Sequence, residues 1–418
     1  MTLKKIGFKA TKYACYSSYV SGSAVFALPA ILFTTFREMY GISYTLLGTL
    51  VLVNFTTQLI IDLIFTFYSK YFNVKKTVVT MPILTSLGLV VYALVPTFFP
   101  KIAYLGLVIG TVIFSVAAGL GEVLLSPIIA ALPSDNKERD MSVLHSLYGY
   151  GILMVVGIST LFLNLFGNHN WMYLTLFFAA LPLISACLYA LSPMPDLSAS
   201  EESGQKDRFR LNRGLLLCAI CIFLGASAEN AMTNWISGFM EKALGISKSM
   251  GDLVGIALFA LLLAFTRTLY AKYGHNIGKT LLLGMIGATI CYLTAGLVTN
   301  SAVCAVACVL TGICTSMLWP GTLIFMEENM PSIGVAAYAL MAAGGDMGSS
   351  IAPQLLGAVT DTVAASGFAE KLSVTLSLSA EQIGMKAGML VSSLFPIFGI
   401  AVVIIMRRYF KGRKNENI

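Results

Sequence analysis

Twelve long apolar segments, separated by short polar stretches, most constrain what this chain can fold into. A helix needs about 20 apolar residues to cross the hydrocarbon core of a membrane. The first six segments occupy residues 13–36, 43–67, 77–99, 102–131, 141–166 and 171–192, and the second six occupy 214–240, 249–271, 280–299, 301–328, 333–364 and 385–406. Because backbone polar groups in lipid must satisfy one another, these segments predict an all-α membrane protein of twelve transmembrane helices.

The composition supports lipid, rather than water, as the main solvent. Of the 418 residues, 57% are apolar and only 11% are Asp, Glu, Lys or Arg, whereas a soluble domain carries roughly 25% charged residues. The formal charge of +7 comes from short basic clusters between the apolar segments and not from one continuous face. The lipid bilayer is therefore the expected partner, and nucleic acid is not.

The cysteines do not form a metal or disulfide framework. All eight fall inside apolar segments: Cys15, Cys187, Cys218, Cys221, Cys291, Cys304, Cys308 and Cys314. Cys218 and Cys221 have the spacing of a redox or zinc motif, but no second pair accompanies them. The sequence also lacks a nucleophile–base pair or a phosphate-binding loop, so we expect no metal, no cofactor and no enzymatic activity.

A polar break divides the segments into two sets of six. The sequence predicts an N-terminal six-helix bundle at 1–192, a linker at 193–213 and a C-terminal six-helix bundle at 214–418. With the N-terminus inside, 21 of the 27 Lys and Arg residues fall on the cytoplasmic side and 6 outside. Because cytoplasmic loops are enriched in Lys and Arg, we expect a multi-pass protein of the cell (cytoplasmic or inner) membrane, with both termini and the linker cytoplasmic.

The two halves are related in sequence. Gly41-Ile42-Ser43, Gly48, Lys70-Tyr71 and Lys76 recur as Gly245-Ile246-Ser247, Gly251, Lys272-Tyr273 and Lys279, at offsets of 202 to 204 residues. Repeats with an even number of helices are parallel and related by a pseudo-two-fold axis, as in the major facilitator fold. In that fold, the substrate lies between the halves near mid-membrane and is exposed alternately to each side.

The densest polar group inside a predicted span lies in residues 214–240. Glu229, Asn230, Asn234 and Trp235 offer a carboxylate, two amides and an indole near the centre of that span. Such groups are typical of sites for sugars and polyols, so we predict that these four side chains bind substrate. The alternative is hydrogen bonding between helices, which contributes only about 0.6 kcal/mol per contact and does not need a carboxylate.

Other spans offer further candidates for substrate binding. They are Tyr16 and Tyr19 in the first span, Asn54 and Gln58 in the second, and Trp319 in the tenth. Trp319 precedes Pro320-Gly321 and faces either a cavity or a kink. Asn54, Gln58 and Asp62 follow one another at four-residue spacing, which gives one polar stripe on a helix.

Two acids lie near the centres of their spans and are predicted to carry protons. An ionisable residue at the bilayer centre costs about 2.5–3.5 kcal/mol on insertion scales, so it is retained for pairing or for function. Glu122 is the only acid in its span, and Asp346 lies in a stretch of small residues. A carboxyl group held away from water can exchange protons at neutral pH. The alternatives are a permanently paired structural acid at Glu122 and close helix packing around Asp346.

Three ionisable residues at a shallower, inner depth are candidates for a cytoplasmic gate. Asp62 lies about 10 Å from the centre of its span toward the cytoplasm. His145 and Arg267 lie at a similar depth in the fifth and eighth spans, and we expect them to share a gate network. A fixed interhelical bond for Asp62, and a structural role near a helix start for His145, are the alternatives.

Several motifs carry a resemblance to a known family. They are Val53-Asn54-Phe55 with Gln58, Glu122-Val123-Leu124 with Ser126-Pro127, Leu144-His145-Ser146, Asn170-Trp171, Ala228-Glu229 with Asn234-Trp235, Gly251-Asp252-Leu253, Trp319-Pro320-Gly321, and Gly344-Gly345-Asp346. With these motifs the chain resembles the fucose-permease-like group of bacterial major facilitator transporters. The resemblance implies proton symport that depends on acids in the first and fourth helices. Glu122 matches the fourth-helix acid, whereas the first span has no acid, a departure from that scheme.

Together these features predict a monomeric secondary active transporter. We expect it to move a small polar solute, such as a sugar, by alternating access and in symport with protons. Three alternatives remain at this point. The 19 methionines would suit a proton antiporter that exports an amphipathic compound; a uniporter would use the same fold; and a membrane sensor without transport is the third.

Overall fold

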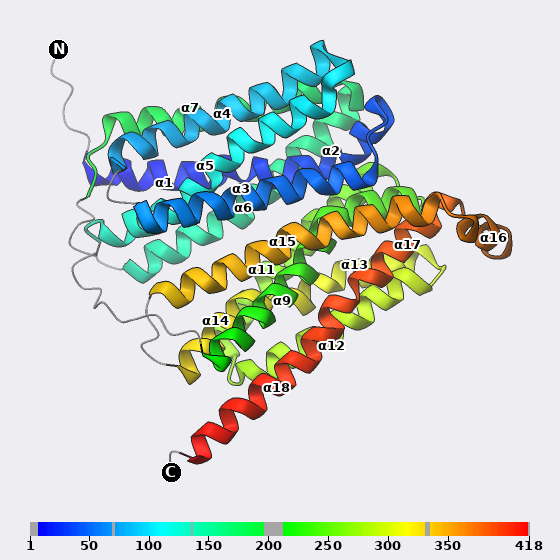
Figure 1. Ribbon diagram of the computed structural model, residues 1–418. Coiled ribbons are helices and arrows are strands. Elements are labelled where there is room, and N and C mark those ends of the chain that lie inside the picture. The colour runs from blue at the N-terminus through cyan, green and yellow to red at the C-terminus, as the bar shows by residue number, and fades with distance from the viewer. Residues whose placement is uncertain (1–6, 69–71, 135–136, 196–211, 331–334, 417–418) are drawn as a thin grey trace. The chain divides into compact units, whose positions relative to one another are not determined.

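The computed structural model describes residues 7–68, 72–134, 137–195, 212–330 and 335–416, and most of these residues are helical (Figure 1). Within them, eleven helices or helix pairs are long and apolar enough to cross a membrane. The remaining predicted span, 333–364, forms the 30-residue helix α15 (Val335–Ala364). At 1.5 Å per residue this helix is about 45 Å long, enough to span a bilayer. The prediction of an all-α membrane protein with twelve spans is therefore confirmed.

The chain forms two compact units. The first contains residues 1–42 and 53–205, and the second contains 43–52 and 206–418. Most of the predicted linker lies at 196–211, outside the described residues, so its placement on the cytoplasmic side stays a prediction. The short segment 43–52 belongs to the second unit, although in sequence it lies between the two parts of the first unit.

Among the described residues, seven α-helices lie wholly or mainly in the first unit, and one of them, α3, begins in the second unit with residues 44–52. These are α1 (Phe8–Gly22), α2 (Ala24–Tyr40), α3 (Tyr44–Tyr68), α4 (Val74–Phe98), α5 (Ala103–Ala131), α6 (Lys137–Phe166) and α7 (Trp171–Leu191), with short 3-10 helices at Pro100–Ile102 and Asn168–Asn170. Helix α4 packs against α5 and α7, and α1 packs against α6 and α7. The first span is interrupted at Ser23, whose single O–H is shared between the carbonyl oxygens of Tyr19 and Tyr148, at 2.9 and 3.1 Å.

Aromatic rings and one close helix approach organise the core of the first unit. Phe36 meets Trp171 edge to face, with ring centroids 4.9 Å apart, and Tyr92 meets Phe36 at 5.7 Å. A Cβ atom at Gly88 would lie 2.6 Å from the backbone nitrogen of Phe114. Only glycine therefore allows α4 and α5 to approach this closely, as small residues commonly do at membrane helix interfaces.

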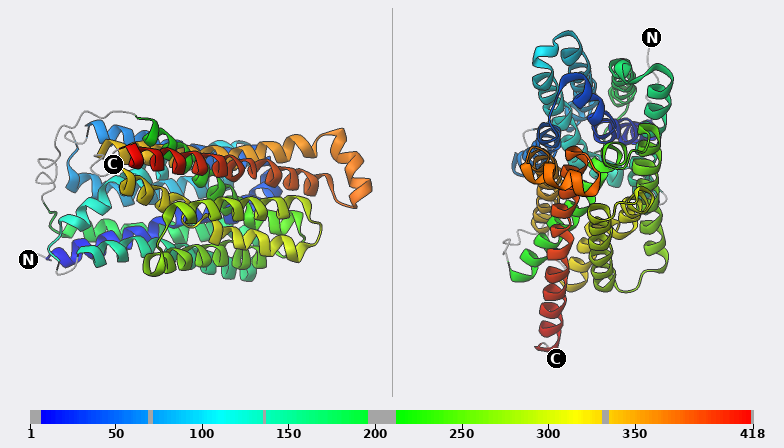
Figure 2. Two further views of the ribbon diagram at one scale, coloured as in Figure 1. Left: turned by 90° about the horizontal axis from the view of Figure 1, so that it is seen from below. Right: turned by 90° about the vertical axis from the view of Figure 1, so that its right-hand side faces the viewer.

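The second unit contains broken as well as continuous helices. These are α9 (Arg213–Gly238) with the π-helical turn η4 (Phe239–Ala243), α10 (Lys248–Met250) with the π-helical η5 (Gly251–Ala257) and α11 (Leu258–Tyr273), α12 (Ile277–Leu297), α13 (Ser301–Thr315), α14 (Leu318–Asn329), α15, α16 (Gly367–Leu376), α17 (Ala380–Ser392) and α18 (Leu394–Glu416). Helix α15 packs along α9 and α17. The short α16 joins α15 to α17, as Figures 1 and 2 show.

Two acidic side chains of the second unit hold the first turn of α3. The backbone amide and the hydroxyl of Thr45 both donate to the Asp361 carboxylate, at 2.6 and 2.7 Å. The Tyr44 hydroxyl donates to the Glu381 carboxylate at 2.7 Å. A helix N-terminus has amide groups without partners in the helix and a partial positive charge. Asp361 thus acts as the capping side chain of α3, although it comes from α15.

Candidate functional site

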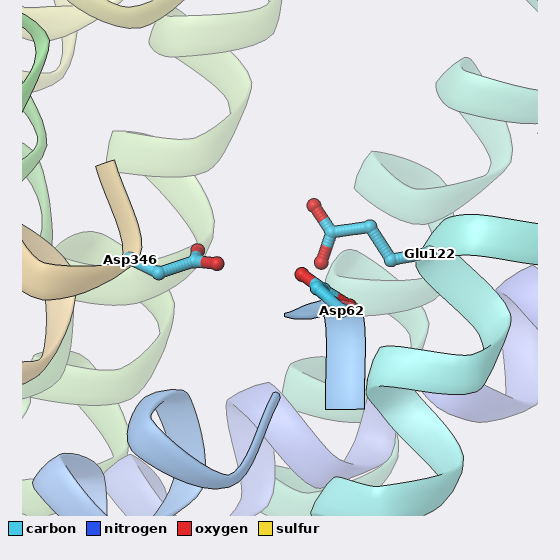
Figure 3. Close-up of side chains that lie close together, drawn as sticks. All are labelled: Asp62, Glu122 and Asp346. Atoms are coloured by element: carbon cyan, nitrogen blue, oxygen red, sulfur yellow. The ribbon is translucent and has the colours of Figure 1, made fainter. Parts of the chain in front are cut away.

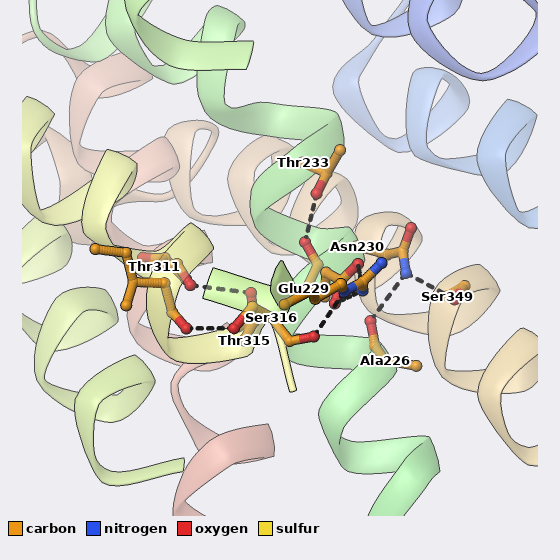
Figure 4. A network of polar contacts seen from close by, with 10 residues as sticks. Ala226, Glu229, Asn230, Thr233, Thr311, Thr315, Ser316 and Ser349 are labelled. Atoms are coloured by element: carbon orange, nitrogen blue, oxygen red, sulfur yellow. Dashed lines mark hydrogen bonds and ion pairs between the residues drawn. The ribbon is translucent and has the colours of Figure 1, made fainter. Parts of the chain in front are cut away.

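The polar residues predicted on the seventh span lie together on α9. The Asn230 side-chain amide donates to the Ser349 hydroxyl on α15 at 2.8 Å and to the Ala226 carbonyl at 3.2 Å (Figure 4). The Asn234 amide donates to the Asn230 carbonyl at 2.9 Å. Much of this row is therefore satisfied internally. Asn230 and Glu229 remain half-buried.

Glu229 forms an ion pair with Arg267 on α11. The Arg267 Nη2 atom lies 3.3 and 3.4 Å from the two Glu229 carboxylate oxygens. The Arg267 Nε–H donates to the Ser316 carbonyl at 2.8 Å. Pro320 has no N–H and cannot donate to the carbonyl four residues before it, which is that of Ser316. The break between α13 and α14 thus supplies the acceptor that orients Arg267.

The two predicted tryptophans have different surroundings. The Trp235 ring is only 1% exposed, and its indole N–H donates to the Pro353 carbonyl at 2.9 Å. Its ring meets that of Tyr44, with centroids 5.4 Å apart. Trp319 is half-buried, and its ring packs directly against Gly345 of α15. Trp235 thus contributes to packing in this structure, whereas Trp319 has part of its ring accessible.

In the first unit, Asn54 and Gln58 form a polar contact between α3 and α5. The Gln58 amide and the Ser115 hydroxyl both donate to the Asn54 side-chain oxygen, at 2.9 and 2.6 Å. One turn further on, a Cβ atom at Gly119 would lie 3.2 Å from the Gln58 Cα atom. Both amides are buried. The two predicted substrate contacts are thus engaged with each other and with α5.

Further along these two helices, Asp62 and Glu122 face each other. Their carboxylate oxygens lie within 4.8 Å, and Figure 3 shows the two side chains directed toward one another. Asp62 is half-buried, and Glu122 is exposed at the surface of its unit. A proton on either carboxyl group removes the repulsion that two carboxylates would have at this separation. The residue predicted as a gate and the one predicted as a proton carrier therefore form one pair.

The tyrosines predicted in the first span contact other helices of the first unit. The Tyr16 hydroxyl donates to the Asp140 carbonyl at the start of α6, at 3.3 Å. Lys12 forms an ion pair with the Asp140 carboxylate. Tyr19 is half-buried against the apolar cluster that contains residues of α5, and it interacts with Ser126 there. Tyr19 therefore contacts α5 one turn after Glu122, whereas Tyr16 connects α1 to α6.

The remaining predicted residues are placed less completely. Asp346 lies on α15, is 4% exposed, and projects from that helix in Figure 3. His145 lies within α6, but its side chain is outside the described residues. The predicted network between His145 and Arg267 stays a prediction, and the described partners of Arg267 are Glu229 and Ser316.

Sequence reasoning missed a buried cation. Lys386 on α17 is 6% exposed, and its ammonium donates to the carbonyls of Val298 and Ala295, at 2.6 and 3.2 Å, where α12 ends. Cations at a helix C-terminus interact favourably with its unsatisfied carbonyls. The signal was a lysine at the start of an apolar span. The contacts indicate a structural role.

Comparisons with known proteins agree with this architecture. A homologue of the human lysosomal transporter Spinster, from a bacterium, superposes with a TM-score of 0.77 at 13% identity over 97% of each chain. A D-xylose–proton symporter gives 0.72 at 15% identity over 94% of this chain and 97% of its own. The Escherichia coli fucose:proton symporter gives 0.60 at 14% over 97% and 99%. At these identities the likeness shows the fold alone.

The sequence itself identifies the family. No curated protein matches the chain. Residues 15–353, however, match the family model described as the Major Facilitator Superfamily. This range contains both polar groups described above, nine of the predicted spans in full, and parts of the first and the eleventh. The membrane-spanning helices, the helix order and the family model lead to one conclusion, which is that the chain is a multi-pass membrane transporter that belongs to the Major Facilitator Superfamily.

Proposed function

We propose that this transporter is a proton-coupled symporter for a small polar solute of the sugar type. The observation that carries the proposal is the Asp62–Glu122 pair, with carboxylate oxygens within 4.8 Å on facing helices. Two carboxylates this close repel each other unless a proton neutralises one of them. The pair therefore provides a place in the membrane span where a proton is bound in one state and released in another.

Coupling requires the proton and the solute to favour the same conformation. A ligand shifts a conformational equilibrium only by its difference in affinity between the two states. When the pair is open to water, a carboxylate is solvated and the proton leaves. When water is excluded, the proton stays. Alternation between these states, with Glu122 as the carrier and Asp62 as its neighbour, ties proton movement to solute movement. Asp346 is the reserve carrier in the second unit.

The α9 row supports a polar solute. Glu229 and Asn230 are half-buried on one helix, with Trp319 at the start of α14 as an apolar surface. A carboxylate and an amide exchange hydrogen bonds with hydroxyl groups, and an aromatic ring packs against the apolar face of a sugar. Asn234, Asn54 and Gln58 fix the neighbouring backbone and helices, so their contribution to binding is positional.

Transport by purified protein in proteoliposomes tests this proposal. An inward proton gradient should drive accumulation of a radiolabelled sugar mixture by the wild type. Glu122→Gln mimics the protonated acid permanently, so it should keep solute exchange between equal concentrations on both sides but lose accumulation. Accumulation equal to that of the wild type would make Glu122 structural. A wild type that ignores the gradient would be a uniporter, and accumulation driven by an outward gradient would indicate antiport.

We also propose that the protein lies in the cytoplasmic membrane with both termini and residues 193–213 inside the cell. The 21-to-6 distribution of Lys and Arg supports this orientation. A cysteine introduced at Ser203, in a variant in which the exposed Cys187 is Ser, should resist a membrane-impermeant thiol reagent in intact cells. It should react after the cells are opened. Labelling of intact cells at Ser203 would reverse the topology.

A further inference from the structure

Arg267 is held in one orientation inside a membrane-spanning helix. An arginine within a span is costly and marks a functional site by default. Two acceptors fix its guanidinium. The Ser316 carbonyl binds Nε at 2.8 Å, and Glu229 binds Nη2 at 3.3 and 3.4 Å. These contacts use Nε and Nη2, and Nη1 takes part in neither. The guanidinium cannot rotate without losing them.

The opposite edge of the guanidinium is not used in the described part of the chain. No described residue accepts a hydrogen bond from Nη1, and the Arg267 side chain is 40% exposed. The Nη1–Nη2 edge has two parallel N–H groups whose spacing matches the two oxygens of a carboxylate. The contacts to Glu229 are also longer than the 2.7–2.9 Å of a strong charge-assisted hydrogen bond. Glu229 therefore orients the guanidinium without saturating it.

Two groups that can accept hydrogen bonds from hydroxyls lie on α9, at the residue that contacts Arg267 and at the residue after it. Glu229 immediately precedes Asn230 on α9. The Asn230 side-chain oxygen accepts no hydrogen bond from the described residues. A carboxylate on Arg267 would place the remainder of a small solute near Glu229, one residue from Asn230 on α9. The set consists of one cationic edge and two hydroxyl acceptors. It is complementary to a molecule that carries both an acid and hydroxyl groups.

We propose that the solute is a hydroxylated carboxylic acid of the sugar-acid class, and that Arg267 binds its carboxylate. This inference rests on the proposed symport of a sugar-type solute and narrows its substrate class. The charges agree with coupling. Arg267 and Glu229 together are neutral, so a bound carboxylate adds one negative charge to the span. One proton taken up with it restores the charge of the empty carrier.

Matched pairs of ligands test the inference on the full-length purified protein. D-galactose is compared with D-galacturonate, and D-glucose with D-glucuronate, by thermal shift and by tryptophan fluorescence titration at fixed ionic strength. We expect each acid to half-saturate the wild type at a concentration at least tenfold lower than its neutral partner. Arg267→Gln should abolish this preference. Lys272→Gln, which removes an exposed positive charge from the same helix, should retain it.

A second variant keeps the test valid if Arg267→Gln fails to fold. Arg267→Gln combined with Glu229→Gln leaves no buried charge without its partner, so it should purify as a folded protein and show no preference for the acids. A preference for the acids that persists in the double variant overturns the inference. Equal or tighter binding of the neutral sugars to the wild type also overturns it, but leaves the proposed function intact. If neither sugars nor sugar acids bind, the sugar-type substrate class fails as well.

Discussion

The two units keep acids inside the membrane by different means. In the first unit, Asp62 and Glu122 place two carboxyl groups within 4.8 Å of each other. In the second, Glu229 lies 3.3 Å from the guanidinium of Arg267. Two carboxylates at short distance repel each other until one of them binds a proton, whereas a carboxylate and a guanidinium attract each other. The energy of the Asp62–Glu122 pair therefore depends on proton binding, whereas the charges of Glu229 and Arg267 neutralise each other without a proton.

The two units differ in this way although their sequences share a repeat. The Gly41-Ile42-Ser43 turn and its repeat at Gly245-Ile246-Ser247 have the same backbone conformation, with φ of +66° and +68° at the glycines. The helices that follow diverge. Helix α3 is α-helical throughout and carries Asp62, whereas its counterpart passes through the π-helical η5 before it reaches Arg267. The two related helices thus differ both in their helix type and in the ionisable side chain, Asp62 or Arg267, that they carry.

The largest expected effect comes from breaking the ion pair of the second unit. Arg267→Gln leaves the Glu229 carboxylate without its cation in the protein interior. Breaking a buried pair from one side costs about 3–5 kcal/mol. Because Arg267 is 40% exposed, we expect a loss of about 3 kcal/mol, at the lower end of this range. Thermal and denaturant unfolding of the purified protein in one detergent measures it.

The double variant sharpens this prediction. Arg267→Gln with Glu229→Gln removes both charges, so most of the lost stability should return, to within about 1 kcal/mol of the wild type. If instead the loss of stability in the double variant equals the sum of the losses in Arg267→Gln and in Glu229→Gln, the two residues do not interact. In that case the contrast between the two units would not rest on the Arg267–Glu229 contact.

Helix positions were predictable from the sequence because they depend on local patterns. The apolar runs located the spans, and four-residue spacing placed Asn54, Gln58 and Asp62 on one stripe that in fact faces α5. The end of the last span was less well predicted. Apolar residues suggested 385–406, whereas α17 and α18 extend from Ala380 to Glu416 and are interrupted at Ser393. A helix can continue through polar residues at its ends, so the limits of an apolar run do not mark the limits of the helix.

Partners across helices were not predictable, because the helical repeat says which residues share a face but not which helix that face contacts. Arg267 was expected near His145, yet its described partners are Glu229 and a carbonyl at the α13–α14 break. One part of this site did have a local signal. Pro320 leaves the Ser316 carbonyl without its helical donor. A search for a cation beside each such carbonyl would have pointed to Arg267.

An intermediate effect is expected from the carboxyl pair of the first unit, with the opposite sign. Asp62→Asn removes one of two like charges, so it should leave stability unchanged or raise it by about 1 kcal/mol. Repulsion between the carboxylates grows as pH rises, so the unfolding midpoint of the wild type should fall toward high pH. That of Asp62→Asn should fall less. A loss of stability at every pH would show instead that Asp62 is a structural acid.

The smallest effect is expected from the polar contact of Asn54, Gln58 and Ser115 between α3 and α5. The variant tests whether this contact holds the two helices together. Ser115→Ala removes the hydroxyl that donates to the Asn54 oxygen at 2.6 Å, while Gln58 continues to donate to the same atom. Hydrogen bonds between membrane helices contribute about 0.6 kcal/mol on average. We expect a loss of that size and a small decrease in proton-driven accumulation, because α3 and α5 carry the two acids.

Ser159 on α6 provides the matched control for Ser115. Both serines are fully buried in the first unit, and the Ser159 hydroxyl has no hydrogen-bond partner among the described residues. Ser159→Ala removes the same atom without removing a contact, so it should be neutral or slightly stabilising. The difference between the two variants isolates the Ser115–Asn54 hydrogen bond from the loss of a hydroxyl group. Equal unfolding midpoints would mean that this bond adds nothing to the α3–α5 interface. The register of Asp62 against Glu122 would then depend on close packing at Gly119, where a Cβ atom would lie 3.0 Å from that of Ile61.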